Sequence, residues 1–238
     1  MGYWNSYSET WPSTDIRFIG LSTKTFSGNW PISFTNVNVG SASTIYQSLL
    51  VILAGISEAS GQALFTSIKA GGQECTLAIQ NQFSSGDYQH KALYYIPWNS
   101  NSGTTTTITL SGTGISQPDG LDIAIYRLDN VRNATPQFTY RNQIATQENS
   151  WTFSGMQIGD LVIGGVGTEI GNVLPNWNWT GLTENFDTRY QPINTNYYIS
   201  GANTRITTNG NQTFNVRNLS ITGPGTEYPW QVVSAVWR

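Results

Sequence analysis

The sequence predicts an all-β protein made of two tandem, internally duplicated antiparallel β-sandwich units, jelly-roll-like and with little helix. Apolar and polar residues alternate in short runs, as in residues 32–39, which is typical of strands with one buried face. Glycine, proline, asparagine and aspartate separate these runs at short intervals. Similar patterns then recur, in the same order, in the two halves of the chain.

The proposed duplication relates residues 15–130 to residues 134–238. The matches retain apolar spacing and glycines rather than ionisable residues, so we expect a duplicated scaffold and not a duplicated active site. At a spacing of 111 positions the matching segments are Leu50-Val51-Ile52 with Leu161-Val162-Ile163, residues 108–114 with 219–225, and Ile125-Tyr126-Arg127 with Val236-Trp237-Arg238. At other spacings they are Phe34, Val37 and Gly40 with Phe153, Met156 and Gly159, and Tyr94-Tyr95-Ile96 with Tyr197-Tyr198-Ile199.

The expected strands follow one another in the same order in each half. In the first half, an alternating opening strand at residues 16–19 precedes the alternating strand 32–39. Residues 49–53 are continuously apolar, which is typical of a central strand covered on both faces. The strand at Tyr94-Tyr95-Ile96 is followed by a Thr-rich strand, which is β-branched, and by a closing strand that ends in an aromatic residue and arginine. Each half therefore has about six or seven strands.

Residues 57–69 are the one segment where the sequence favours helix, of one or two turns. The segment contains Ala59, Ala63 and Leu64, although Gly61 weakens the prediction. The linker at residues 129–136 is short and polar, which favours two docked units over a flexible tether. The sequence leaves open whether the halves form separate sandwiches or one larger sandwich.

Residues 1–14 lie outside the duplication and form an aromatic-rich N-terminal arm. Each of its large rings gains roughly 1.5–3 kcal/mol by leaving water, so we expect the arm to dock on its own domain or on another protein. Aromatic residues concentrate binding energy in interfaces, which makes the arm a candidate protein interface. Packing on the same chain is an equally weighted alternative. The candidate interface residues are Tyr3, Trp4, Tyr7 and Trp11.

Composition excludes several classes of function. Charged residues make up 11% of the 238 residues and the net charge is −3, with no cluster of lysine and arginine for nucleic acid or for a membrane surface. Cys75 is the single cysteine, so we expect a buried apolar side chain and no disulfide or multi-cysteine metal site. The sequence shows no signal peptide or membrane span, and we expect a soluble product that starts at Met1. The four glycosylation sequons are read as chance matches.

The ionisable residues do not assemble into a recognisable catalytic motif. His90 follows Ser84, Ser85 and Asp87 within one loop, where a triad would need converging elements, so we expect a surface or loop histidine. Glu58 and Glu169 follow matching strands and are expected to have a repeated structural role. A glycan hydrolase would need Glu58 or Glu184 to share a cleft with another acid. We therefore expect no enzyme activity and no cofactor.

Two binding sites have weaker support in the sequence. Asp119, Asp122 and Asp129 could offer oxygen ligands to calcium, although a β-turn followed by an edge strand explains them more simply. The segment Trp177-Asn178-Trp179, with Asp187 downstream, is the candidate glycan-binding site, because exposed tryptophans stack on sugars while Asn and Asp bind hydroxyls. The alternative is favoured: alternating tryptophans face one side of a strand, in the core or an interface.

The second half resembles a jelly-roll-like module common in tailed bacteriophages. The resemblance lies in Gly159-Asp160-Leu161-Val162, in Trp179-Thr180-Gly181-Leu182 and in the aromatic–arginine closing strand. The first half fits more loosely, through Ile125-Tyr126-Arg127, and has Gln47-Ser48 where the second half has Gly159-Asp160. The resemblance implies a virion surface protein: a capsid decoration protein, a head fibre or a small tail adhesin. It supplies no catalytic residues.

These observations together predict a non-enzymatic virion structural protein on the particle surface, made in the host cytoplasm. A capsid decoration or head-fibre protein is favoured, and a carbohydrate- or receptor-binding tail adhesin is the alternative. Expected partners are capsid or other virion proteins, further copies of the same chain in a homo-oligomer, and host surface glycans in the adhesin alternative.

Overall fold

The computed structural model describes residues 13–25, 29–41, 47–58, 64–82, 88–99, 103–114, 120–144, 146–169, 176–190, 197–220 and 230–238. These residues form seventeen β-strands and no helix, and every strand pairing is antiparallel. The predicted all-β fold is confirmed. The described part of the chain also has no helix that could cross a membrane.

The first half forms two sheets. Sheet A has the order β1-β9-β3-β7-β6 and sheet B the order β2-β8-β4-β5. The strands are β1 (Asp15–Thr25), β2 (Ile32–Asn38), β3 (Leu49–Glu58), β4 (Leu64–Ala70), β5 (Gln73–Glu74), β6 (Thr76–Gln82), β7 (Tyr88–Pro97), β8 (Thr105–Thr113) and β9 (Gly120–Asp129).

The second half forms two further sheets. Sheet C has the order β10-β17-β12-β15-β14 and sheet D the order β11-β16-β13. The strands are β10 (Phe138–Ile144), β11 (Glu148–Met156), β12 (Leu161–Glu169), β13 (Trp177–Thr180), β14 (Thr183–Tyr190), β15 (Tyr197–Arg205), β16 (Gly210–Asn218) and β17 (Trp230–Trp237).

The two halves have the same strand order apart from the short β5. In each half the opening strand pairs with the closing strand, the second strand with the Thr-rich strand or its equivalent, and the Leu-Val-rich strand with the Tyr-Tyr-Ile strand. These three pairings occur in a jelly roll. A jelly roll has a fourth pair, in place of which β6 here pairs with β7 and β14 pairs with β15. The described strands of one half enter no sheet of the other. Descent of the halves from one duplicated unit stays a prediction.

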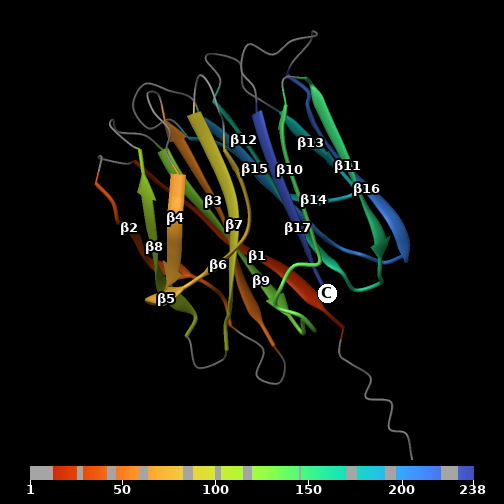
Figure 1. The fold of residues 1–238 in the computed structure, drawn as a ribbon, viewed down its shortest axis with the longest axis horizontal. Coiled ribbons are helices and arrows are strands. Elements are labelled where there is room, and N and C mark those ends of the chain that lie inside the picture. The colour runs from red at the N-terminus through yellow and green to blue at the C-terminus, as the bar shows by residue number, and fades with distance from the viewer. Residues whose placement is uncertain are drawn as a thin grey trace, which may run out of the picture.

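The four sheets are stacked in the order B, A, C, D, as Figure 1 shows from β2 and β8 at one side to β11 and β16 at the other. Three apolar cores separate them. The first core, between sheets B and A, includes Phe34, Leu50 and Ile125. The second core, between sheets C and D, includes Trp151, Val162 and Phe214. The central core, between sheets A and C, includes Leu53, Tyr126, Ile163, Val233 and Trp237.

The central core explains the continuously apolar strands. In β3, Leu50 and Ile52 point into the first core, whereas Leu49, Val51 and Leu53 point into the central core. Strands β9 and β17 are likewise buried along their whole length. Sheets A and C are therefore covered on both faces, as the run at residues 49–53 predicted.

Some of the matches proposed from the sequence agree with the structure. Asn36 lies in a bulge of β2 with φ 57°, and Gly155 lies in the corresponding bulge of β11 with φ 71°. Gly40 and Gly159, each just beyond these strands, also have positive φ, at 67° and 92°. A left-handed backbone conformation thus recurs in both halves at two places: in the bulge of the strand and just beyond the strand.

Other matches are wrong. Leu50 points into the first core, but Leu161 points into the central core, so the two leucines lie on opposite faces of their strands. Ile108 lies within β8, whereas Leu219 lies in the turn after β16. Because side chains alternate with a period of two, an alignment of apolar residues alone tolerates a displacement of one residue that reverses the face.

The predicted helix is also wrong where the structure describes it. Its first residues end β3, and Leu64–Ala70 forms β4. Phe65, Ile68 and Ala70 are buried in the first core. Pairing of β4 with β8 therefore prevails over the weak helical preference of the segment. Residues 59–63 lie outside the described residues.

Candidate functional site

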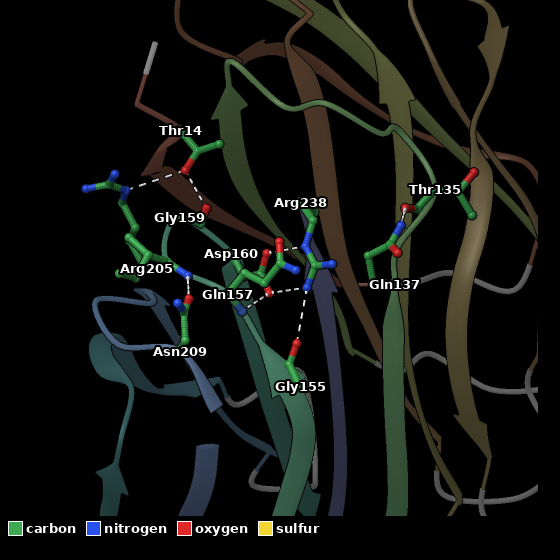
Figure 2. A network of polar contacts seen from close by, with 11 residues as sticks. Thr14, Thr135, Gln137, Gly155, Gln157, Gly159, Asp160, Arg205, Asn209 and Arg238 are labelled. Carbon is green, nitrogen blue, oxygen red and sulfur yellow. Dashed lines mark hydrogen bonds and ion pairs between the residues drawn. The ribbon is translucent and has the colours of Figure 1, made fainter. Parts of the chain in front are cut away.

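One concave feature of the described residues is a polar pocket at one pole of the second half, where several strand ends meet. It lies beside the start of β1, the β11–β12 turn and the ends of β15 and β17. Figure 2 shows several of the residues that line it, among them Thr14, Arg205 and Arg238. The pocket has a volume of about 260 Å³ and is lined chiefly by Thr14, Arg132, Gln157, Ile158, Arg205 and Arg238.

One side of the pocket is held by an ion pair between Arg238 and Asp160. The Nε and Nη2 atoms of Arg238 each donate to one carboxylate oxygen of Asp160, both at 2.8 Å. Asp160 is fully buried and also accepts from the main-chain N–H of Gln157 at 2.8 Å. Hydrogen bonding to Asp160 raises the pKa of Arg238. This bidentate pair fastens the end of β17 to the turn that precedes β12.

The opposite side is formed by Thr14 and Arg205. The hydroxyl of Thr14 donates to the carbonyl oxygen of Gly159 and accepts from Nε of Arg205 at 3.4 Å. Arg205 is exposed, and within the described part of the chain no carboxylate lies within ion-pair distance of it. Ile158, on the rim, is 60% exposed.

The chemistry of the pocket is that of anion recognition. Three arginines line it, and one of them, Arg238, has its guanidinium bound to both oxygens of Asp160. A guanidinium remains protonated at neutral pH and offers a planar set of N–H donors that matches carboxylates and phosphates. The pocket is suited to binding a negatively charged group, and the described residues that line it include no acidic residue or histidine.

The matching arginine of the first half is used differently. Arg127, which matches Arg238, is buried and donates from Nη2 to the carbonyl oxygens of Val39 and Gly40, at 2.6 and 2.9 Å. Burial lowers the pKa of Arg127 to about 10. The nearby carboxylate, Asp129, pairs instead with Arg17 at 2.5 Å. Both closing arginines thus fasten a strand end to the turn after the second strand of the half.

The candidate glycan-binding tryptophans are core residues. Trp177 and Trp179 are only 3% and 8% exposed and point into the second core. The ring of Trp177 packs on Trp230 with centroids 5.0 Å apart, and Nε1 of Trp179 donates to the Ser200 hydroxyl at 2.9 Å. No ring face is left for a sugar, so stacking at these residues is contradicted. Alternation along β13 had already favoured this outcome.

The polar neighbours of these tryptophans are directed elsewhere. Asn178 is exposed on the outer face of β13. Asp187 accepts from the main-chain N–H of Trp177 at 3.3 Å, and desolvation raises its pKa. Desolvation and, to a lesser extent, Asp187 also raise the pKa of Glu184. The two acids are neighbours on β14, at the edge of sheet C, and neither lines the polar pocket.

The other candidate interface residues, Tyr3, Trp4, Tyr7 and Trp11, lie outside the described residues. The prediction that they form an interface stays a prediction. The described chain begins at Ser13 and Thr14, which line the polar pocket.

His90 is not a surface or loop histidine. It lies in β7, is fully buried and packs on Phe65 with ring centroids 4.9 Å apart. Its Nδ1 accepts from the main-chain N–H of Phe65 at 3.1 Å, which requires the neutral ring with its proton on Nε2. Burial, with a smaller contribution from Lys91, lowers the pKa of His90 to about 4. Ser84, Ser85 and Asp87 lie outside the described residues.

The sequence analysis missed a buried ion pair between Lys91 and Asp122. Nζ of Lys91 lies 3.0 and 2.9 Å from the two carboxylate oxygens of Asp122, and both side chains are at most 1% exposed. The pair reaches across Gly55 of β3, where a Cβ would lie 2.2 Å from both groups, and Lys91 also lies over the ring of Tyr197. No sequence pattern joins the two residues, since β3 separates their strands.

This pair also bears on the alternative that Asp119, Asp122 and Asp129 bind calcium. Asp122 is bound to Lys91, and its strand β9 lies between β1 and β3, so the predicted edge strand is wrong. Asp129 is bound to Arg17 and to the Ser48 hydroxyl, and Asp119 lies outside the described residues. In the described ranges no three histidine, cysteine or acidic side chains gather as a metal site requires. Cys75 is buried, as predicted, and burial raises its pKa to about 12.

The fold and the pocket together define a class: a pair of stacked jelly-roll-like sandwiches with a cationic pocket at one pole. Comparison with known proteins gives no match to a family model, to a curated protein or to a solved structure.

Proposed function

We propose that this chain is a non-enzymatic structural protein on the surface of a bacteriophage particle, most simply a capsid decoration or head-fibre protein. The observation that carries the proposal is that the residues on which the phage resemblance depends hold the fold together. Asp160, in Gly159-Asp160-Leu161-Val162, receives the terminal guanidinium of the aromatic–arginine closing strand. Trp179 of the second motif lies in the core between sheets C and D.

The charged groups of the described core support the same proposal. Lys91 is bound to Asp122, Arg127 to main-chain carbonyls, and Asp129 to Arg17. Each of these groups fixes one element against another, which is what a rigid building block needs. Sheets A and C are covered on both faces, so the two halves form a continuous stack rather than two tethered domains.

Attachment through the N-terminal arm is the mechanism we favour. The last two residues of the arm, Ser13 and Thr14, line the pocket, so the arm joins β1 at the pole that carries the pocket. Its tyrosines and tryptophans would bury apolar surface against a particle subunit, each large ring contributing roughly 1.5–3 kcal/mol. The rest of the protein would then be attached to the particle through the pole that carries the pocket.

The test removes residues 1–12 and keeps Thr14 with its contacts. We expect the truncated chain to keep its circular dichroism spectrum and melting temperature but to be absent from particles assembled in its presence, as measured by mass spectrometry of purified particles. The full-length chain is the control. Normal incorporation of the truncated chain would refute attachment by the arm, and absence of the full-length chain from particles would refute the virion role itself.

A further inference from the structure

We propose that the pocket between Arg132, Arg205 and Arg238 binds a carboxylate group on an acidic segment of the protein to which this chain attaches. This inference rests on the proposed function and deepens it, because it assigns a second contact with the particle at the pole where the arm joins β1.

The distribution of charge is the first argument. The chain has a net charge of −3 and only 11 lysine and arginine residues, yet three arginines line this one small pocket. The described residues that line the pocket include these three arginines and no acidic residue, and the neighbouring Asp160 is buried with both oxygens bound to Arg238. The side chains around the pocket therefore carry an excess of positive charge on an acidic protein.

The geometry of Arg205 is the second argument. Its Nε is held by Thr14, and within the described part of the chain its two Nη groups have no hydrogen-bond partner. A guanidinium fixed at one edge and open at the other is arranged for a bidentate contact with an incoming carboxylate. The exposed position of the side chain means that the contact requires no rearrangement of the core.

The surroundings favour a protein segment over a free ion. Ile158, at 60% exposure, stands on the rim next to the guanidinium groups. Protein interfaces combine arginine with apolar and aromatic side chains in this way. Ser13 and Thr14 also line the pocket, so a partner bound by the aromatic arm would lie beside it.

The first experiment measures binding of a short poly-glutamate peptide, blocked at both ends, to the full-length chain by calorimetry at low salt. We expect measurable binding that weakens with added salt, and a loss of about tenfold or more in Arg205→Gln, since a charge-assisted contact is removed. A poly-lysine peptide of equal length is the ligand control. Arg217→Gln is the protein control: this exposed arginine lies at the other end of β16, and its replacement should leave the affinity unchanged.

Three results would overturn the inference: no binding of the poly-glutamate peptide, equal affinity in wild type and Arg205→Gln, or equal binding of poly-lysine. N-acetylneuraminic acid is titrated in parallel. If this acidic sugar binds through Arg205 and the peptide does not, the pocket takes a saccharide and the protein-segment inference is wrong. Circular dichroism of both variants shows that a lost signal does not come from unfolding.

The second experiment separates this inference from the proposed function. Arg205→Gln is offered to particles beside the wild-type chain, and we expect a lower occupancy that falls further with salt. If wild type and variant occupy particles equally, the pocket inference fails while the virion role stands. If wild type is absent from particles but binds the peptide through Arg205, the virion role fails and the carboxylate specificity of the pocket stands.

Discussion

At the scale of single residues, the described interior contains polar groups whose charge state is set by burial. His90 accepts a hydrogen bond from the Phe65 N–H and is enclosed by the first core. Protonation at Nδ1 would break that bond and place a charge in an apolar region. The folded state therefore holds His90 neutral, with a pKa of about 4 in place of 6.5.

His90 predicts a dependence of stability on pH. Between pH 6.5 and about 4 the unfolded chain binds a proton at His90 that the folded chain does not, so stability falls as the pH is lowered through this window. The full loss attributable to His90 is about 3 kcal/mol. Urea unfolding at a series of pH values measures it. His90→Asn, which keeps an acceptor for the Phe65 N–H, should be less stable at pH 7 but should show a shallower slope; an unchanged slope would contradict the assignment.

At the scale of elements, the approach of β12 to sheet A depends on glycine. A Cβ on Gly165 would lie 2.4 and 2.6 Å from the two Cδ atoms of Leu53, which is fully buried on β3. Gly164 and Gly167 are similarly crowded, by Trp179 on one face and by Lys91 on the other. The glycines of this strand therefore set the distance between the layers that flank it.

Gly165→Ala should destabilise the protein by about 1–3 kcal/mol, because the added methyl group forces Leu53 out of a packed position. The matched control is Gly20→Ala in β1, where nothing lies within 4 Å of a Cβ. The control should change stability by no more than about 0.5–1 kcal/mol, and in the stabilising direction if at all. Equal destabilisation by both substitutions in urea unfolding would show that loss of glycine, and not crowding, is responsible.

The elements also show what the sequence could predict. Alternation and turn residues correctly predicted strands at residues 32–39 and around Thr105–Thr113, since these are local signals. Helix at residues 57–69 was wrong because pairing of β4 with β8, distant in sequence, decided the outcome. The register of Leu50 against Leu161 was wrong because apolar residues fill both faces of β3 and β12, which removes the alternation that would fix the face.

The candidate site was less predictable than the strands. Trp177 and Trp179 look alike in a core strand and in a sugar-binding strand, and only burial distinguishes the two. The residues of the polar pocket come from the segment before β1, the linker between β9 and β10, the β11–β12 turn and the ends of β15 and β17. No spacing in the sequence relates Arg132, Arg205 and Arg238, since folding brings together segments that are distant in the chain. The exception is Arg238 with Asp160, whose motifs were both recognised.

At the scale of the whole molecule, the two halves depend on each other. The central core contains Leu161, Ile163, Val233, Ala235 and Trp237 on the side of sheet C, all buried only because sheet A covers them. Asn81 of β6 also donates from its amide to the carbonyl oxygen of Asn142 at 2.6 Å. Each half taken alone would present a large apolar face to water.

Residues 134–238 expressed alone should therefore self-associate. Size-exclusion chromatography with light scattering should show dimers or larger species, whereas the same fragment with Ile163→Lys and Val233→Lys should run as a monomer or fail to fold. Circular dichroism distinguishes these two results. A folded, monomeric fragment without the lysines would contradict the assignment of the central core as a true interior.

The position of β17 has a further consequence, for synthesis on the ribosome. This strand, the last one described, lies between β10 and β12 in the middle of sheet C. Translation at roughly 5–20 residues per second releases β10 to β16 before it. The second half therefore lacks its middle strand until all of its other described strands have been synthesised, while the first half already has β9. A stop codon ahead of Trp230 would take out the centre of that sheet rather than trim its edge.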